Sequence, residues 1–244
     1  MVRLIDTHVH LDFYDDPMQM AQCYESHKVY AVFVTHLPEL FKRYEPLYSS
    51  MKYVRLAVGY HPHMFGSFPF DEAAFFDCIQ RTKYIGEVGL EGGRGSAPME
   101  EQLMVFRKIC TLSSRDKLLS IHSRKAESEV LDVMVGEEVK FAIFHWYTGS
   151  VDLIDDILDA GYYFSVNSSM VNSSRGKRIL GRIPIERVLV ETDGPFTKID
   201  GVVSHPKFLH RVYEKLGDFY DEPDIGAVVF NNFRRLLKQL EGSL

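Results

Sequence analysis

Two histidines near the start of the chain, His8 and His10, follow a short apolar run that is typical of a β-strand. Side chains two residues apart on a strand point to the same face, so both imidazoles could hold one metal ion. The pair alone is a weak signal, but four more potential ligands end later apolar runs. These residues are Glu87, His122, His145 and Asp193. Six candidate ligands at strand ends predict a hydrolase that binds two divalent metal ions.

Glu87 is the expected bridge between the two ions, because one carboxylate can bind two metals and the nearby glycines leave room for other groups. His8 and His10 would then hold one ion, and His122 and His145 would hold the other. Imidazole nitrogen and carboxylate oxygen are preferred ligands of zinc and related metals.

Asp193 has three possible roles, since it could bind a metal, orient the attacking water or accept its proton. Water that is bound to a metal ion loses a proton near neutral pH and would serve as the nucleophile. A serine nucleophile is not expected, because the sequence contains no Gly-x-Ser-x-Gly motif.

Eight apolar runs alternate with segments of helical periodicity, as in a sheet of buried parallel strands. The runs are Leu4–His8, Ala31–His36, Val54–Gly59, Tyr84–Leu90, Leu118–His122, Phe141–His145, Tyr162–Val166 and Val188–Asp193. Eight strand–helix units in a chain of this length predict an α/β fold, a (β/α)8 TIM barrel that forms a single domain over residues 1–244. An open doubly wound sheet is the main alternative. The candidate ligands favour the barrel, because barrel enzymes place their active sites at the carboxyl ends of the strands.

Apolar stripes at helical spacing predict several of the helices between the strands. Gly161 and Gly217 each follow such a stripe and are expected to end a helix. Four stripes cover Leu103–Cys110, Leu153–Leu158, Phe208–Leu216 and Ile225–Leu240.

The composition is that of a globular protein with a sizeable core, since 45% of the 244 residues are hydrophobic. The formal net charge of −6 excludes a basic coat for nucleic acid, so an anionic substrate must be bound locally by metals or a few cations. Three widely spaced cysteines predict reduced thiols. Asp6 and Asp12 interrupt the apolar segment that a signal peptide would need, and no apolar run approaches the roughly 18 residues of a membrane span. The predicted location is therefore cytoplasmic.

The chain resembles the TatD-like metal-dependent DNases, which belong to the wider amidohydrolase-like superfamily. The motifs that carry this resemblance run in family order over nearly the whole chain. They are Ile5–Asp12, Gly59–His63, Ile85–Leu90, Ile121–Arg124, Phe144–Gly149 and Val190–Pro195.

This resemblance implies a TIM barrel, two or more divalent ions (Mg, Mn or Zn) and hydrolysis of phosphodiester bonds in DNA. It implies the same six metal ligands, His8, His10, Glu87, His122, His145 and Asp193. Glu191 lies two residues before Asp193 and is a further candidate for binding metal or positioning water. Three residues resemble the family's phosphate-binding groups or stand beside them: His61, His63 and Arg124.

Three segments depart from the family pattern, and their loops are expected to differ from those of other members. Glu91 stands where the family usually has Asp, Trp146–Gly149 replaces an aromatic-Ser-Gly run, and Phe196–Asp200 replaces an Arg-Asn-x-Pro run. Trp146 and Tyr147 could stack on bases or cap the barrel. His36 ends the second strand and could line the site, although a loop or core position is favoured.

The sequence therefore predicts a metal-dependent deoxyribonuclease, acting as a 3′-to-5′ exonuclease on single-stranded or frayed DNA ends through a water activated by two metals. Glu87, Asp193 and Glu191 are the candidate catalytic residues. Another metal-dependent hydrolase on the same barrel, such as a phosphoesterase, lactonase or amidohydrolase, remains the alternative, because a fold does not fix the substrate. A nuclease subunit of a multi-protein defence system is a further possibility. A non-enzymatic subunit of a larger complex is another, although a binding scaffold has no need for all six ligands.

Overall fold

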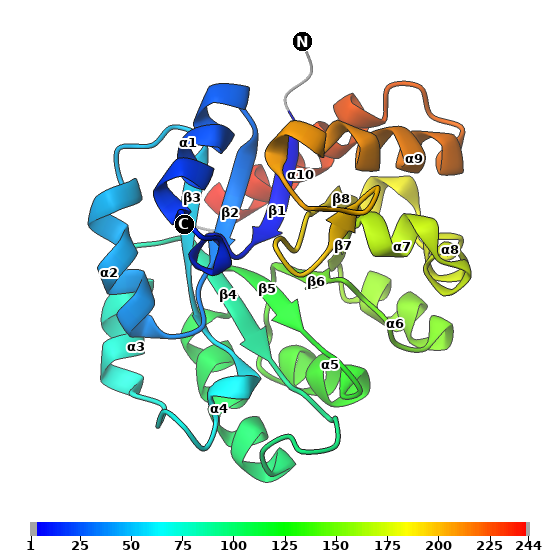
Figure 1. The fold of residues 1–244 in the computed structure, drawn as a ribbon. Coiled ribbons are helices and arrows are strands. Elements are labelled where there is room, and N and C mark those ends of the chain that lie inside the picture. The colour runs from blue at the N-terminus through cyan, green and yellow to red at the C-terminus, as the bar shows by residue number, and fades with distance from the viewer. Residues whose placement is uncertain (1–3, 243–244) are drawn as a thin grey trace.

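Eight parallel strands form a nearly closed barrel with helices on its outside, as Figure 1 shows in colours that follow the chain. The computed structural model describes residues 4–242, so residues 1–3 and 243–244 of the expected domain lie outside the described part. Neighbours in the barrel follow one another in the sequence, from β1 to β8. The strands are β1 (Ile5–Val9), β2 (Tyr30–Val34), β3 (Val54–Tyr60), β4 (Tyr84–Gly89), β5 (Leu118–His122), β6 (Ala142–His145), β7 (Tyr163–Val166) and β8 (Val188–Val190).

The barrel closes through hydrogen bonds that join β1 to the end of β8 and the residues directly after it. The amide of Asp193 donates to the carbonyl of His8, and the amide of His10 donates to the carbonyl of Gly194, each over 2.9 Å. The hydroxyl of Thr7 donates to the carbonyl of Val190 over 3.2 Å. These bonds confirm the predicted barrel over an open sheet, and they place His8 and Asp193 side by side.

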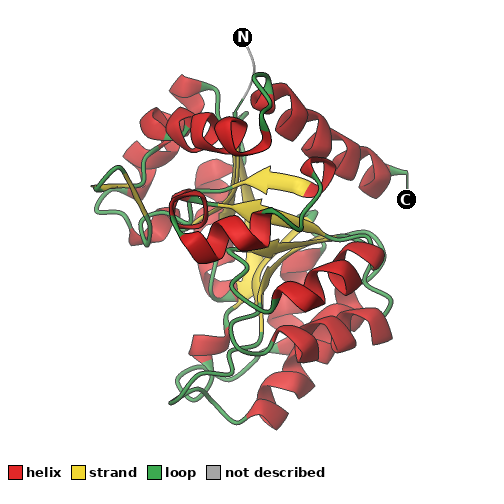
Figure 2. Cartoon of the chain, turned by 90° about the vertical axis from the view of Figure 1, so that its right-hand side faces the viewer, coloured by secondary structure: helices red, strands yellow, loops and turns green. Residues whose placement is uncertain are grey.

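The helices lie around the outside of the strands in the view of Figure 2, and the inner face of a TIM barrel is filled by side chains of the strands themselves, so both faces of the sheet are covered. Covered strands need apolar residues on both faces, which explains the near-continuous apolar runs. The helices are α1 (Pro17–His27), α2 (Pro38–Tyr48), α3 (Glu72–Ile79), α4 (Met99–Ser113), α5 (Glu127–Gly136), α6 (Ile154–Asp159), α7 (Ser168–Asn172), α8 (Ser174–Leu180), α9 (His210–Tyr220) and α10 (Ile225–Glu241).

Two details differ from the expectations. Gly217 lies inside α9, and the helix ends at Tyr220, followed by Asp221 in a left-handed conformation with φ of 52°. The eighth apolar run was expected to reach Asp193, but β8 ends at Val190 and a short antiparallel hairpin follows, made of β9 (Lys198–Ile199) and β10 (Val202–Val203). Gly161 does follow the end of α6, with φ of 89°.

Candidate metal centre

The predicted ligands meet at the carboxyl end of the barrel, because each one lies in the carboxyl-terminal half of its strand or just after it. His8 lies in β1, Glu87 lies in β4, and His122 and His145 are the last residues of β5 and β6. Asp193 follows β8 with φ of 47°, a conformation that is uncommon for residues other than glycine and is found at functional sites.

The carboxylate of Glu87 is the centre of the cluster, and it is 2% exposed. Five imidazoles converge on it. The nitrogen–oxygen distances are 2.7 Å for His122, 2.8 Å for His145, 3.2 Å for His61, 3.3 Å for His10 and 3.4 Å for His8. A single carboxylate surrounded by five histidines is far from a surface ion pair and is typical of a metal site.

The two oxygens of Glu87 face different histidines. Oε2 faces His8 and His10. Oε1 faces the remaining three imidazoles. Asp193 Oδ1 completes the Oε2 side, at 3.3 Å from His10 Nε2 and 3.7 Å from His8 Nε2. Each oxygen of one carboxylate thus has its own set of nitrogens, which is the arrangement that a bridging ligand needs.

Gly59 of β3 allows the backbone of Glu87 to lie close to the neighbouring strands. A Cβ atom at Gly59 would stand 1.9 Å from the carbonyl oxygen of Thr35 and 2.5 Å from the amide nitrogen of Glu87. Any larger side chain would therefore push β3 and β4 apart and move the carboxylate.

The close packing of acidic and basic groups in the cluster shifts the pKa values of Glu87, His8 and His10. Burial alone would raise the pKa of Glu87, but the imidazoles, led by that of His61, hold it well below its ordinary value. Burial lowers the pKa of His8 to about 3. Burial also acts to lower the pKa of His10, but Asp193 and Glu87 outweigh it and raise that pKa to about 9. A divalent cation between these groups would take the place of such protons.

Several buried atoms of the cluster lack a hydrogen-bond partner, which is rare in folded proteins. Three of them are His10 Nδ1, His145 Nδ1 and Asp193 Oδ1. Ligand atoms of His8, His10 and Asp193 lie within 4.8 Å of one another, as do those of His61, Glu87 and His122. These nitrogen and oxygen donors fit divalent metal ions of the zinc, manganese and magnesium classes.

Buried side chains behind the cluster fix the orientation of the candidate ligands. Ser120 Oγ lies 2.7 Å from His8 Nδ1, so it can set which ring nitrogen of His8 faces the metal side. Asp6 accepts hydrogen bonds from the hydroxyl of Tyr24 at 2.6 Å, and from the amide and hydroxyl of Thr192 at 2.8 and 2.7 Å. It thereby anchors the residue that precedes Asp193.

Glu191 is fully buried and faces His145 from the side opposite Glu87, with Oε1 3.8 Å from His145 Nδ1. Its carboxylate accepts hydrogen bonds from the amide of Trp146 at 3.0 Å, from Asn167 Nδ2 at 3.1 Å and from the hydroxyl of Ser165. These three donors hold the carboxylate beside His145, where it can orient the imidazole.

Glu91, the position that departs from the family, binds the outer nitrogen of His122. His122 Nδ1 lies 2.7 Å from Glu87 and its Nε2 lies 2.8 Å from Glu91 Oε2. His63 Nε2 is 3.6 Å from the same oxygen. Burial opposes the change, but His122, Arg124 and His63 together lower the pKa of Glu91.

The predicted phosphate contacts divide into two groups. His61 is buried inside the cluster, at 5% exposed. His63 and Arg124 are exposed at its rim. The structure therefore separates His61, which joins the candidate ligands, from two groups that an approaching anion would reach first.

His36 lies in the site, contrary to the loop or core position that the sequence favours. It is 7% exposed, and its ring centroid lies 4.8 Å from that of His10 and 4.9 Å from that of His61. Tyr147 is fully buried and donates to the carbonyl of Ser150, so it caps the barrel instead of stacking on bases.

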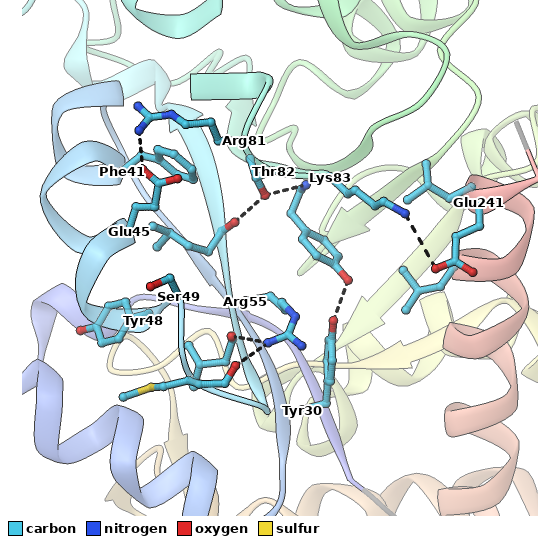
Figure 3. Close-up of a pocket in the computed structure, with 16 residues that line it drawn as sticks. Tyr30, Phe41, Glu45, Tyr48, Ser49, Arg55, Arg81, Thr82, Lys83 and Glu241 are labelled. Carbon is cyan, nitrogen blue, oxygen red and sulfur yellow. Dashed lines mark hydrogen bonds and ion pairs between the residues drawn. The ribbon is translucent and has the colours of Figure 1, made fainter. Parts of the chain in front are cut away.

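A pocket of about 540 Å³ opens at the opposite end of the barrel, where β2, β3 and β4 begin (Figure 3). Its charges are paired with one another: Arg81 with Glu45 at 2.5 Å and Lys83 with Glu241 at 3.8 Å. The guanidinium of Arg55 donates to two backbone carbonyls. Polar groups at this end of a TIM barrel generally serve stability, and none of the candidate ligands lines the pocket.

Across residues 4–242, no helix has both the length and the apolar character to cross a bilayer.

Comparison with known proteins agrees with this geometry. The family model of TatD related DNase matches residues 5–238. An uncharacterized metal-dependent hydrolase of Bacillus subtilis is 26% identical over 96% of this chain and 99% of its own length. A protein of Dickeya dadantii named 3′-5′ ssDNA/RNA exonuclease TatD is 28% identical over 76% of this chain and 77% of its own length.

A solved structure of a TatD homolog from Escherichia coli has the same fold. It superposes with a TM-score of 0.86 at 21% identity and covers 96% of this chain and 98% of its own. The match of the family model over nearly the whole chain is decisive for the assignment. The chain belongs to the TatD-related DNase family and is a metal-dependent hydrolase.

Proposed function

We propose that this chain is a metal-dependent deoxyribonuclease that removes nucleotides from single-stranded or frayed DNA ends in the 3′-to-5′ direction. The observation that carries the proposal is the carboxylate of Glu87, whose two oxygens face separate sets of imidazoles. Such a carboxylate suits two metal ions about 3.5–4 Å apart, which is the arrangement used for phosphodiester hydrolysis.

The ligands divide between the two oxygens of Glu87. His8, His10 and Asp193 would hold one ion, and His122 and His145 would hold the other, with His61 close to it. When bound, Mg, Mn or Zn would supply charge stabilisation and a water nucleophile at neutral pH.

The remaining groups act on the water and the substrate. Asp193, as a ligand of the first ion, would lie beside water held there, where it could orient the attacking water or accept its proton. Glu191 would hold His145 in position rather than contact the substrate. His63 and Arg124, exposed at the rim, would bind a phosphate next to the scissile bond, with His61 deeper in the site.

Two properties support a DNA end as the substrate. The cluster is buried at the carboxyl end of the barrel, with His8, His10, Glu87 and Asp193 at most 4% exposed, so one flexible strand would reach it more easily than a stiff duplex. The net charge of −6 provides little non-specific attraction for a long duplex. Relatives named 3′-5′ ssDNA/RNA exonuclease support the polarity. The cytoplasmic location and the partners in a defence system stay predictions.

A time course on end-labelled oligonucleotides tests the proposal. Purified protein is stripped with chelator, reloaded with Mg²⁺, Mn²⁺ or Zn²⁺, and mixed with linear single-stranded DNA, RNA, closed circular DNA, a lactone and an amide. We expect stepwise shortening of linear DNA from its 3′ end in the presence of metal. His122→Ala should abolish the reaction, whereas His27→Ala, a matched change at an exposed histidine of α1, should not. Rapid cutting of closed circles, or hydrolysis of the lactone or amide alone, would overturn the exonuclease assignment.

A further inference from the structure

Two large aromatic side chains stand exposed beside the buried cluster. Phe13 is 52% exposed and Phe196 is 54% exposed, and their ring centroids lie 5.1 Å apart. They come from opposite ends of the chain, one after β1 and one after β8. Their proximity is therefore a product of barrel closure and not of sequence neighbourhood.

Both rings contact one of the candidate metal ligands, His10. The imidazole of His10 lies edge-on to each, with centroids 5.9 Å from Phe13 and 5.1 Å from Phe196. Phe13 also lies 5.1 Å from the ring of His36. The two phenylalanines, here called the aromatic wall, thus begin at the cluster and continue outward to the solvent.

The backbone holds the aromatic wall in place through the same segments that carry the ligands. Phe13 belongs to a single helical turn, Leu11–Phe13, and its own amide donates to the carbonyl of His10 over 3.2 Å. The amide of Phe196 donates to the carbonyl of Asp193 over 2.9 Å. A group that rests on the wall is therefore held at a fixed position relative to the cluster.

Nucleobases are the ligand chemistry that this surface fits. Flat aromatic rings next to a phosphodiester-cleaving centre meet the π-faces that every base presents, and stacking of this kind tolerates any sequence. The chain has a net charge of −6, so stacking would supply binding energy that electrostatics does not. A protein or lipid partner at this place would obstruct the metal centre.

We propose that Phe13 and Phe196 form a stacking wall for a nucleobase that flanks the scissile phosphate. The inference rests on the proposed nuclease function and adds the means by which the substrate strand is held. A stacked base would place its own phosphate over the cluster, and the wall would make cleavage depend on the base being present but not on which base it is.

The test combines protein variants with substrates that lack one base. Phe13→Ala and Phe196→Ala are compared with the native protein on single-stranded oligonucleotides that are intact or abasic at the last or penultimate position. Stacking on one base corresponds to about a 5- to 150-fold fall in kcat/KM for the alanine variants on intact DNA. On the oligonucleotide that lacks the stacked base, the native protein and the variants should react at similar rates. Phe196→Tyr should retain the native rate, because the aromatic face remains.

Phe76→Ala is the matched control, since Phe76 is 51% exposed on the outer helix α3. Metal content and Tm of every variant should equal those of the native protein. Equal falls in kcat/KM on intact and abasic DNA would show that the aromatic wall only supports the cluster. An unchanged kcat/KM would show that the wall does not bind the substrate. Either result overturns the inference and leaves the proposed nuclease function unaffected. If the native protein cleaves no nucleic acid at all, the proposed function fails, and the inference fails with it.

Discussion

Replacing Glu191 with alanine should destabilise the protein far more than replacing it with glutamine. The carboxylate is fully buried and accepts hydrogen bonds from Trp146, Ser165 and Asn167. Alanine leaves all three donors without an acceptor, those of Ser165 and Asn167 fully buried and the amide of Trp146 partly buried, and each unsatisfied group costs about 1–3 kcal/mol. The expected loss is therefore about 3–9 kcal/mol, against about 5–15 kcal/mol for the whole fold.

Glutamine preserves most of these contacts. Its carbonyl oxygen can still accept from Trp146 and Asn167, and its amide can donate to the hydroxyl of Ser165, which rotates to accept. A loss of about 1–2 kcal/mol is expected from weaker, uncharged hydrogen bonds.

Urea denaturation of metal-free protein measures both values without a contribution from bound metal. An equal loss in the free energy of unfolding of both variants, or a loss of less than about 1 kcal/mol for Glu191→Ala, would contradict this role of the three hydrogen bonds. Such a result would mean that the three donors find other partners, and that Glu191 does not fix the position of His145 through them.

Four further outcomes follow from the same geometry. Saturation with metal at about 100 times Kd should stabilise the protein by about 2.7 kcal/mol for each ion bound, which raises Tm by about 5–10 °C per ion in calorimetry. Glu87→Gln should remove most of the metal-dependent rise in Tm, because it takes away the charge at the centre of the cluster. The same calorimetric scan measures this. Metal binding at pH 7 should release protons, since the pKa of His10 in the metal-free protein is raised to about 9; titration calorimetry in buffers of different ionisation enthalpy counts them. Burial raises the pKa of Asp6 to about 7, above its value in the unfolded chain. Between pH 4 and 7 the folded protein therefore retains a proton that the unfolded chain loses, and the free energy of unfolding falls as the pH rises through this range. Unfolding curves at both pH values should therefore show Asp6→Asn gaining stability relative to the native protein at the higher pH; a constant difference would contradict the shift.

Apolar runs predicted the eight strands because buried parallel strands must be apolar on both faces. Leu118–His122 agrees with β5 at both ends. Asp193 lies beyond β8, since its φ of 47° cannot continue a strand, and no propensity signals that conformation in an aspartate. Gly217 was expected to end a helix, but it lies inside α9, where a Cβ would stand 2.9 Å from the carbonyl oxygen of Glu222. That reason for a glycine is a tertiary contact, which the local sequence does not contain.

Side chains behind the cluster were the hardest part to predict. Ser120 and Asp6 fix His8 and the segment before Asp193, but neither residue type at its position signals such a role. His36 could have been found, because it follows β2 at the same barrel end as the ligands, yet its contact with His10 depends on barrel curvature. Hydrogen bonds between strands that are far apart in sequence become visible only in the folded barrel.

Anomalous X-ray diffraction from crystals loaded with Mn²⁺ would locate each metal ion in the Glu87 cluster independently of activity. We expect two peaks about 3.5–4 Å apart, with the carboxylate of Glu87 between them. One peak should lie near His8, His10 and Asp193, and the other near His122, His145 or His61. Crystals of Glu87→Gln, loaded in the same way, should lose at least one peak. A map of the native protein with no peak among these residues, at saturating Mn²⁺, would contradict the metal centre.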